Sequence, residues 1–217
     1  ERAEMEELLA TSRGKLLAAR RERESPGRDD KLLTAWNGLA ISAFAEGYPI
    51  FQDNHYLKAA SKTAIFLQNN LVADAGRLLR SWRGGRPGPT AFLDDYACLA
   101  EGMLALYEVS GTAWHLEWAL ALGEELLALF GAEDGGLWAS GSDQEQLYFR
   151  HRESLDGATP APSGVAAQVL VRLGWHFARD DLRQAAARVI AAEAKHLRSY
   201  PWGCTSLLEA AQMLQQP

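Results

Sequence analysis

The apolar residues of this chain recur at the three- and four-residue intervals of the α-helix almost throughout. This periodicity predicts an all-α protein with long helices separated by short loops. The predicted helices span residues 2–20, 31–47, 54–71, 92–110, 112–130, 163–178, 180–198 and 204–215.

Two kinds of helix alternate along the chain. The helices that begin near residues 31, 93 and 163 are apolar nearly all round, which is typical of inner helices. Each is followed by an amphipathic helix with a charged outer face. The apolar starts recur after 62 and then 70 residues, so one helical hairpin forms one repeat. An inner ring of apolar helices inside an outer ring is an α/α-toroid, and the few hairpins present here predict an incomplete one.

The loops between hairpins carry minor β-structure in this prediction. Glycine and proline break the helical pattern at 84–89 and 158–164. Strand-like residues occur at 77–82, and a second ribbon is predicted from residues 136–139 and 146–150 around a turn at 141–143.

Three acid-rich segments occupy equivalent positions, just before or at the start of an inner helix. In a toroid such segments gather at one mouth, so we expect their side chains to line one concavity. They are Asp29-Asp30-Lys31, Leu93-Asp94-Asp95-Tyr96 and Asp156-Gly157-Ala158-Thr159-Pro160. The alternative is that these acids only cap helices, since aspartate favours the positive end of the helix dipole.

The first of these segments is crowded with polar and aromatic groups. Asp30, Thr34 and Asn37 fall on one helical face, with Trp36 on the adjoining face. In the second segment we expect Asp94 to cap the helix and Asp95 to be the reactive carboxyl, whose pKa like charge and partial burial can raise.

Composition narrows the range of functions. The net charge of −6 and an isoelectric point near 5.4 argue against nucleic acid as a partner. Cys98 and Cys204 are far apart and form no zinc or disulfide signature, so we expect neither a metal nor another cofactor. The charged start excludes a signal peptide there, and no apolar stretch predicts a membrane span. A single domain of residues 1–217, in a cytoplasmic protein, is the expectation.

Several motifs together resemble those of the YyaL-type, spermatogenesis-associated thioredoxin-like proteins, in the same order and over essentially the whole chain. The motifs that resemble the family are Leu16-Leu17-Ala18-Ala19-Arg20, the run from Asp29 to Leu39, Gly76-Arg77-Leu78-Leu79-Arg80-Ser81-Trp82-Arg83, Phe92-Leu93-Asp94-Asp95-Tyr96-Ala97 and Asp156-Gly157-Ala158-Thr159-Pro160. The chain departs from the pattern at Ser163, where that family often has asparagine.

This resemblance implies a particular architecture. Members of the family carry a thioredoxin-like domain followed by a helical toroid similar to six-hairpin glycosidases and N-acylglucosamine 2-epimerases. The chain has no thioredoxin domain, so it looks like the C-terminal portion of such a toroid.

The resemblance further implies a carbohydrate-active type of cavity, because indole rings stack on sugar rings while carboxylates and amides bind hydroxyls. The expected sugar-binding residues are Trp36, Asn37, Trp82, Arg83, Asp94 and Tyr96, with Arg80 nearby. Each of these residues also has a structural explanation, either as part of the core or as a salt-bridge partner.

Two reactions and one non-catalytic role remain open. Glycoside hydrolysis needs two carboxyls, for which Asp30 with Asp95, or Asp95 with Asp156, are the expected pairs. A 2-epimerase needs an acid and a base, often histidines, yet no histidine lies within the three motifs; His151 only precedes the third. As a non-catalytic module, an incomplete ring exposes apolar helix flanks. We then expect a homodimer, or association with the missing toroid portion or a thioredoxin-like domain.

Overall fold

The computed structural model describes residues 2–145 and 148–216, and it divides into two compact units, 1–30 and 31–217. The first unit contains helix α1 (Arg2–Arg21), which has no buried residue. An irregular segment follows it as far as Asp30. The second unit contains all the remaining elements and the hydrophobic core.

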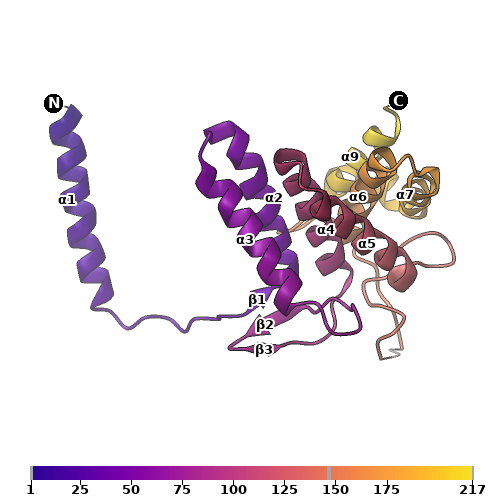
Figure 1. The fold of residues 1–217 in the computed structure, drawn as a ribbon, viewed down its shortest axis with the longest axis horizontal. Helices are drawn as coiled ribbons and strands as arrows, with labels where there is room; N and C mark the ends of the chain where they lie inside the picture. Colours follow the sequence, from indigo (N-terminus) through magenta and orange to yellow (C-terminus); the bar gives the residue numbers. More distant parts are fainter. Residues whose placement is uncertain (1, 146–147, 217) are drawn as a thin grey trace. The chain divides into compact units, whose positions relative to one another are not determined.

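Helical hairpins make up the second unit, as the periodicity predicts (Figure 1). The hairpins pair α2 (Thr34–Phe51) with α3 (Asn54–Asn70), α4 (Leu93–Ser110) with α5 (Ala113–Phe130), and α6 (Pro162–His176) with α7 (Asp180–Ala192). The chain continues through α8 (Ala194–Ser199), the 3₁₀ turn η1 (Pro201–Gly203) and α9 (Thr205–Leu214). The predicted helix at 180–198 is therefore two helices, α7 and α8, which meet at Glu193.

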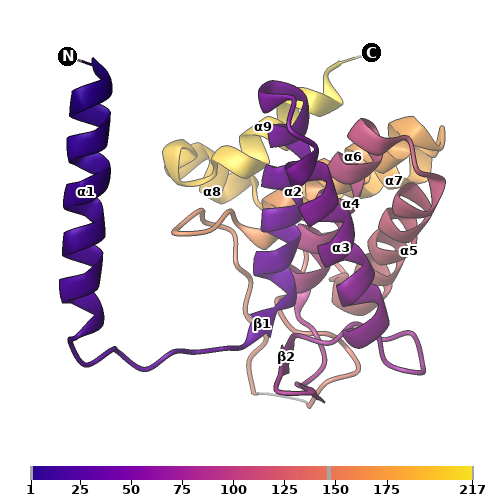
Figure 2. The same ribbon diagram turned by 60° about the vertical axis from the view of Figure 1, so that its left-hand side comes forward.

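The inner helices form one continuous row. Helix α4 contacts α2 on one side and α6 on the other, and α6 contacts α9, whereas α3, α5 and α7 each pack on their own hairpin partner. Figure 2 shows α3 and α5 outside this row. The row is an incomplete α/α-toroid, which confirms the predicted fold class. Among the described residues no helix is both long and apolar enough to cross a bilayer.

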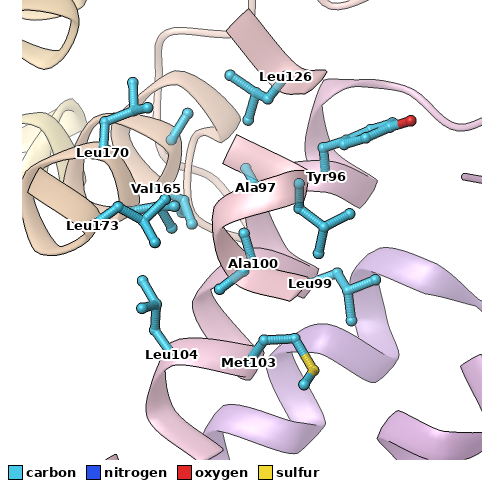
Figure 3. Packing of buried hydrophobic residues seen from close by; sticks show 14 of the residues in the cluster. Tyr96, Ala97, Leu99, Ala100, Met103, Leu104, Leu126, Val165, Leu170 and Leu173 are labelled. Atoms are coloured by element: carbon cyan, nitrogen blue, oxygen red, sulfur yellow. The ribbon is translucent and has the colours of Figure 1, made fainter. Parts of the chain in front are cut away.

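Helix α4 lies at the centre of the core and is buried along most of its length. In Figure 3, Leu104 lies towards Leu173 of α6, whereas Leu99 and Met103 point away from α6. These residues belong to one buried cluster with Leu126 of α5. The inner helix is thus apolar on nearly every side, as its sequence predicts.

Two glycines bring α2 and α4 into close contact. A Cβ atom added to Gly38 would come within 2.5 Å of the backbone carbonyl of Cys98. One added to Gly102 would come within 2.5 Å of the carbonyl oxygen of Gly38. The two helix backbones therefore touch at this crossing, and only residues without a side chain fit there.

A small antiparallel sheet sits at the beginning of α2. Strand β1 (Leu32–Leu33) pairs with β2 (Ser81–Arg83), and β2 pairs with β3 (Arg86–Pro87). The β2–β3 turn uses Gly84 and Gly85 at φ +55° and +81°, a backbone region that favours glycine.

The sheet corrects two details of the sequence prediction. Leu32 and Leu33 are a strand rather than the first turn of a helix, because they pair with Trp82 and Ser81; α2 therefore begins at Thr34. The predicted strand at 77–82 is displaced to 81–83.

The predicted second ribbon is absent from the described part of its range. Residues 136–145 and 148–150 form turns, bends and irregular segments, with an isolated bridge between Gly131 and Leu137. Residues 146 and 147 of the predicted second strand lie outside the described residues.

Candidate functional site

One arginine and two adjacent carboxylates form a tight cluster at the beginning of α4. Arg80 Nη1 lies 2.9 Å from Asp94 Oδ1 and 2.9 Å from Asp95 Oδ2. The carbonyl of Arg80 also accepts a hydrogen bond of 2.9 Å from the N–H of Thr34, the first residue of α2. The cluster therefore links the loop before β2 to the starts of two inner helices.

Asp95 is the structural centre of this cluster. Its Oδ1 accepts a hydrogen bond from the N–H of Ala35 at 3.0 Å, and its Oδ2 accepts one from the N–H of Phe92 at 3.0 Å. Asp95, not Asp94 as predicted, is thus the acid that caps α4. Burial, and after it the charge of Asp94, raise the pKa of Asp95 to about 6, although the backbone donors and Arg80 oppose this rise.

This raised pKa predicts that folding is linked to pH through Asp95. The folded protein binds the proton more tightly than the unfolded chain, so the contribution is favourable below about pH 4 and is lost as the pH rises to 6. The shift corresponds to roughly 3 kcal/mol. We expect the unfolding free energy of the wild type, minus that of Asp95→Asn, to fall by about this amount between pH 4 and 7. Urea denaturation at a series of pH values measures it, and parallel pH profiles would contradict the assignment.

Asp94 faces a cavity instead of the core. Its carboxylate is 29% exposed and accepts both of its described hydrogen bonds from Arg80 Nη1, at 2.9 and 3.2 Å. We name this space of about 220 Å³ the Asp94 cavity. It is lined by Arg80, Phe92, Leu93, Asp94, Ala139, His151 and Glu153.

Two further polar groups in the Asp94 cavity were not among the predicted site residues. His151 Nε2 lies 3.1 Å from Glu153 Oε1, and both side chains are about half exposed. The Ser163 hydroxyl donates to the carbonyl of Glu153 at 2.9 Å, so the serine that departs from the family pattern holds this segment against α6. The cavity therefore contains two carboxylates, an imidazole and a guanidinium.

Asp156 joins the loop before α6 to the start of α9. It accepts hydrogen bonds from the N–H groups of Ala161 (2.8 Å) and Ser206 (3.0 Å) and from the hydroxyls of Thr205 (2.7 Å) and Ser206 (2.5 Å). Burial opposes ionisation, but these donors outweigh it and lower the pKa of Asp156 to about 2. A carboxylate that stays ionised is a structural clamp and a poor proton donor.

Asp156 lines a second space, which we name the Glu101 cavity, of about 370 Å³. Its walls come from α2, α4, α6, α9 and the loop before α6. The lining residues are Leu39, Glu101, Asp156, Gly157, Ala158, Thr159, Pro160, Val165, Gln168, Thr205, Ser206 and Glu209. Thus the structure places Asp94 and Asp156 in two different cavities, which share α4 and the segment before α6.

The residues of the first predicted motif do not share one helical face. Asp30 is exposed and belongs to the first unit, before β1, so it does not share a helical face with Asn37. Trp36 is 64% exposed on α2. The amide of Asn37 donates to the carbonyl of Leu33 at 2.7 Å, which occupies it within the first turn of α2.

The remaining predicted residues divide between surface and core. Arg83 is exposed on β2, and Trp82 beside it is half-buried with its ring edge-on to Phe66 at 6.3 Å. Tyr96 is fully buried, and its hydroxyl accepts hydrogen bonds from Arg77 at 2.7 Å and from the N–H of Leu78 at 3.2 Å. The structure therefore places Tyr96 in the core and not in a sugar-binding cavity.

No group of three or more histidine, cysteine, aspartate or glutamate side chains in the described residues is arranged to hold a metal ion. Cys98 and Cys204 are both buried free thiols. Burial raises the pKa of the Cys98 thiol to about 12, so it is an inert core residue.

The fold and these cavities define an α/α-toroid of the type found in glycosidases and sugar epimerases. The chain superposes on a GH76 α-mannanase of Bacteroides thetaiotaomicron with a TM-score of 0.68 at 15% identity, over 88% of this chain and 54% of that one. For a cellobiose 2-epimerase of Spirochaeta thermophila the TM-score is 0.60 at 19% identity, over 77% and 44%.

A third solved structure is an inactive variant of an α-1,6-mannanase of Salegentibacter sp., with two consecutive aspartates changed to asparagine, in complex with α-1,6-mannotriose. It gives a TM-score of 0.57 at 15% identity, over 74% of this chain and 46% of that one. At these identities the likeness establishes the fold alone.

Sequence similarity is stronger for one curated protein. The chain is 32% identical over 221 residues to human spermatogenesis-associated protein 20, which covers 96% of this chain and 28% of that protein. The two are homologous over this segment, and the chain spans little more than a quarter of its relative. No family model matches the chain.

Proposed function

We propose that this chain is the C-terminal portion of a carbohydrate-active toroid related to spermatogenesis-associated protein 20, and that it hydrolyses glycosides. The observation that carries the proposal is the Asp94 cavity. There the partly exposed carboxylate of Asp94, held by Arg80, faces the same space as Glu153 and His151, at the start of an inner helix. The inactive mannanase variant adds support, because it is changed at two consecutive aspartates, and this chain also has two consecutive aspartates, Asp94 and Asp95.

In this proposal the two carboxylates facing the cavity divide the chemistry. Glycoside hydrolysis requires one carboxylic acid to protonate the leaving oxygen and a second carboxylate to activate water or attack the sugar. Asp94 and Glu153 replace the sequence-based pairs, since both line this cavity, whereas Asp156 lines the other one and is engaged in hydrogen bonds. Asp95 acts as a positioning residue, because its carboxylate is buried and holds Arg80 beside Asp94.

A 2-epimerase is the second candidate, and the placement of His151 favours it. This histidine lies in the same cavity as Asp94, so an imidazole base and a carboxylic acid face one space. Its hydrogen bond with Glu153 would orient the ring, as a hydrogen-bonded carboxylate does for many catalytic histidines.

A screen of substrates separates these candidates. Purified chain would be incubated with α-mannosides, β-glucosides and N-acyl hexosamines, and the products followed by proton NMR. A newly released reducing sugar supports the hydrolase, whereas an inverted C2 configuration with every glycosidic bond intact supports the epimerase. The absence of turnover by a folded chain would favour the non-catalytic module, with a thioredoxin-like domain or a further toroid portion as its proposed partner.

Association is expected whichever reaction applies. Helix α2 carries four large, exposed apolar side chains, Trp36, Phe44, Ile50 and Phe51, of which Ile50 is 72% exposed. Burying such apolar surface in an interface stabilises the association by about 25 cal/mol for each Å². We therefore expect a homodimer, and Phe44→Glu with Ile50→Glu should shift it to monomer. Sedimentation equilibrium at micromolar concentration measures this, and a monomeric wild type would refute it.

A further inference from the structure

Glu101 is a largely buried side chain, and one of its carboxylate oxygens has no hydrogen-bond partner among the described residues. Its Oε1 lies 2.6 Å from Arg172 Nη1, which ties α4 to α6. Its Oε2 is buried and has no hydrogen-bond partner among the described residues. An unpaired buried carboxylate oxygen is costly, so it calls for a specific explanation such as a ligand or an ordered water.

The position of Glu101 favours a ligand as the partner of this oxygen. It follows Asp94 by seven residues and so lies on the same face of α4, two turns further along. Its side chain, 20% exposed, lines the Glu101 cavity. The volume of about 370 Å³ falls in the usual range for small-molecule sites, roughly 300–1,000 Å³.

Three of the side chains in this wall that can donate hydrogen bonds, Thr205, Ser206 and Gln168, have acceptors within the protein. The hydroxyls of Thr205 and Ser206 both donate to Asp156. The amide nitrogen of Gln168 donates to the carbonyl of Ser206 at 2.8 Å and to Glu209 Oε2 at 3.2 Å. Apart from the Thr159 hydroxyl, the side chains of this wall therefore offer a ligand mainly acceptors and negative charge, from Glu101, Glu209 and the side-chain carbonyl of Gln168.

We propose that the Glu101 cavity binds a sugar unit that donates hydrogen bonds, preferring an amine-bearing hexose, then a neutral one, and rejecting an acidic one. The proposal rests on the proposed carbohydrate function and names the class of sugar. A protonated amine or a hydroxyl donates to Glu101 once its buried Oε2 turns towards the cavity, while Leu39 and Val165 contact the apolar face of the ring. A uronate or a sugar phosphate brings a second negative charge beside Glu101, Asp156 and Glu209, and repulsion excludes it.

Isothermal titration with glucosamine, methyl α-mannoside and glucuronate tests the order of affinities on the wild-type chain. Glucosamine should bind at least about tenfold more tightly than glucuronate, since charge-assisted hydrogen bonds are the stronger class. Equal or stronger binding of glucuronate would overturn the proposal without the need for any variant.

Glu101→Gln tests the residue directly. The variant keeps an oxygen for Arg172 and replaces the unpaired acceptor with an amide donor, so glucosamine affinity should fall on the order of tenfold. Glu108→Gln is the matched control. Glu108 Oε1 pairs with the same Arg172 at 2.7 Å, but Glu108 does not line the cavity. Unchanged affinity in Glu101→Gln, or equal losses in both variants, would overturn the proposal.

Sugar binding and glycoside turnover are measured separately, so the proposed subsite and the proposed reaction can be refuted independently. Titrations repeated in Asp74→Asn should give wild-type affinity for glucosamine, because Asp74 is exposed and lines neither cavity. If no glycoside is turned over but the affinity order holds, the proposed reaction fails and the subsite stands. If turnover is found but Glu101→Gln binds normally, only the subsite fails.

Discussion

Replacing Gly38 with alanine is expected to destabilise the second unit by about 3 kcal/mol or more, or to prevent its folding. The added Cβ would lie 2.5 Å from the backbone carbonyl carbon and oxygen of Cys98 and 2.6 Å from the nitrogen of Leu99. Overpacking usually costs about 1–3 kcal/mol when flexible side chains can move aside. Here the obstacle is helix backbone, so the α2–α4 crossing itself must open.

The same helix provides a control for this prediction. A Cβ on Gly47 of α2 would meet the ring of Tyr56 at 3.4 Å, an ordinary contact. Gly47→Ala should therefore leave stability unchanged or raise it by up to about 1 kcal/mol through helix propensity. Urea denaturation of both variants gives the comparison. A Gly38→Ala protein as stable as Gly47→Ala would show that the two inner helices are not in backbone contact.

Sequence periodicity was sufficient to predict the helices and their roles. The apolar run from Leu93 to Leu106 has hardly any polar face, and the structure buries nearly all of it. Helix α6 begins at Pro162, one residue from the predicted start, because proline suits the first turn of a helix. Helix burial and helix starts depend on residues that are close in sequence, so the sequence pattern predicts them.

Long-range pairing could not be predicted in this way. Leu32 and Leu33 look helical in isolation, but backbone pairing with Trp82 and Ser81, about fifty residues later, makes them a strand. Similarly, adjacent acids at a helix start look equivalent in sequence. Only the positions of the Ala35 and Phe92 N–H groups show that Asp95 is the cap and that Asp94 faces outwards.

The candidate site was predicted in part for the same reason. The second acidic motif lies at the start of α4 and the third in the loop before α6, but their side chains line two different cavities, and no residue of the first motif lines either. Glu101 carried a usable signal, since its spacing of seven residues from Asp94 puts both on one face of α4. His151 and Glu153 carried none, because their loop has no periodicity that predicts where a side chain points.

Changing Asp94 to asparagine is expected to lower kcat/KM for a glycoside by about 10²–10⁴-fold, the usual range for a general acid or base. The substitution removes the carboxyl that faces the Asp94 cavity and leaves Arg80 paired with Asp95. Folding should be little affected, because Asp94 makes its described hydrogen bonds to Arg80 alone and is partly exposed. Initial rates on the substrate found in the screen, with circular dichroism of both proteins, measure the effect.

Asp95→Asn is the informative comparison for that variant. Asparagine has one acceptor oxygen in place of two, so it leaves a buried donor from Ala35, Phe92 or Arg80 unpaired and costs about 1–3 kcal/mol of stability. At a temperature where it is folded, its kcat should lie within about tenfold of the wild type, with the acidic limb of the pH–rate profile displaced because Arg80 is no longer fixed. Asp74→Asn, at an exposed loop position, controls for the loss of one negative charge. If Asp95→Asn abolishes turnover while Asp94→Asn retains it, the reactive carboxyl is Asp95, and the positioning role assigned to it here is refuted.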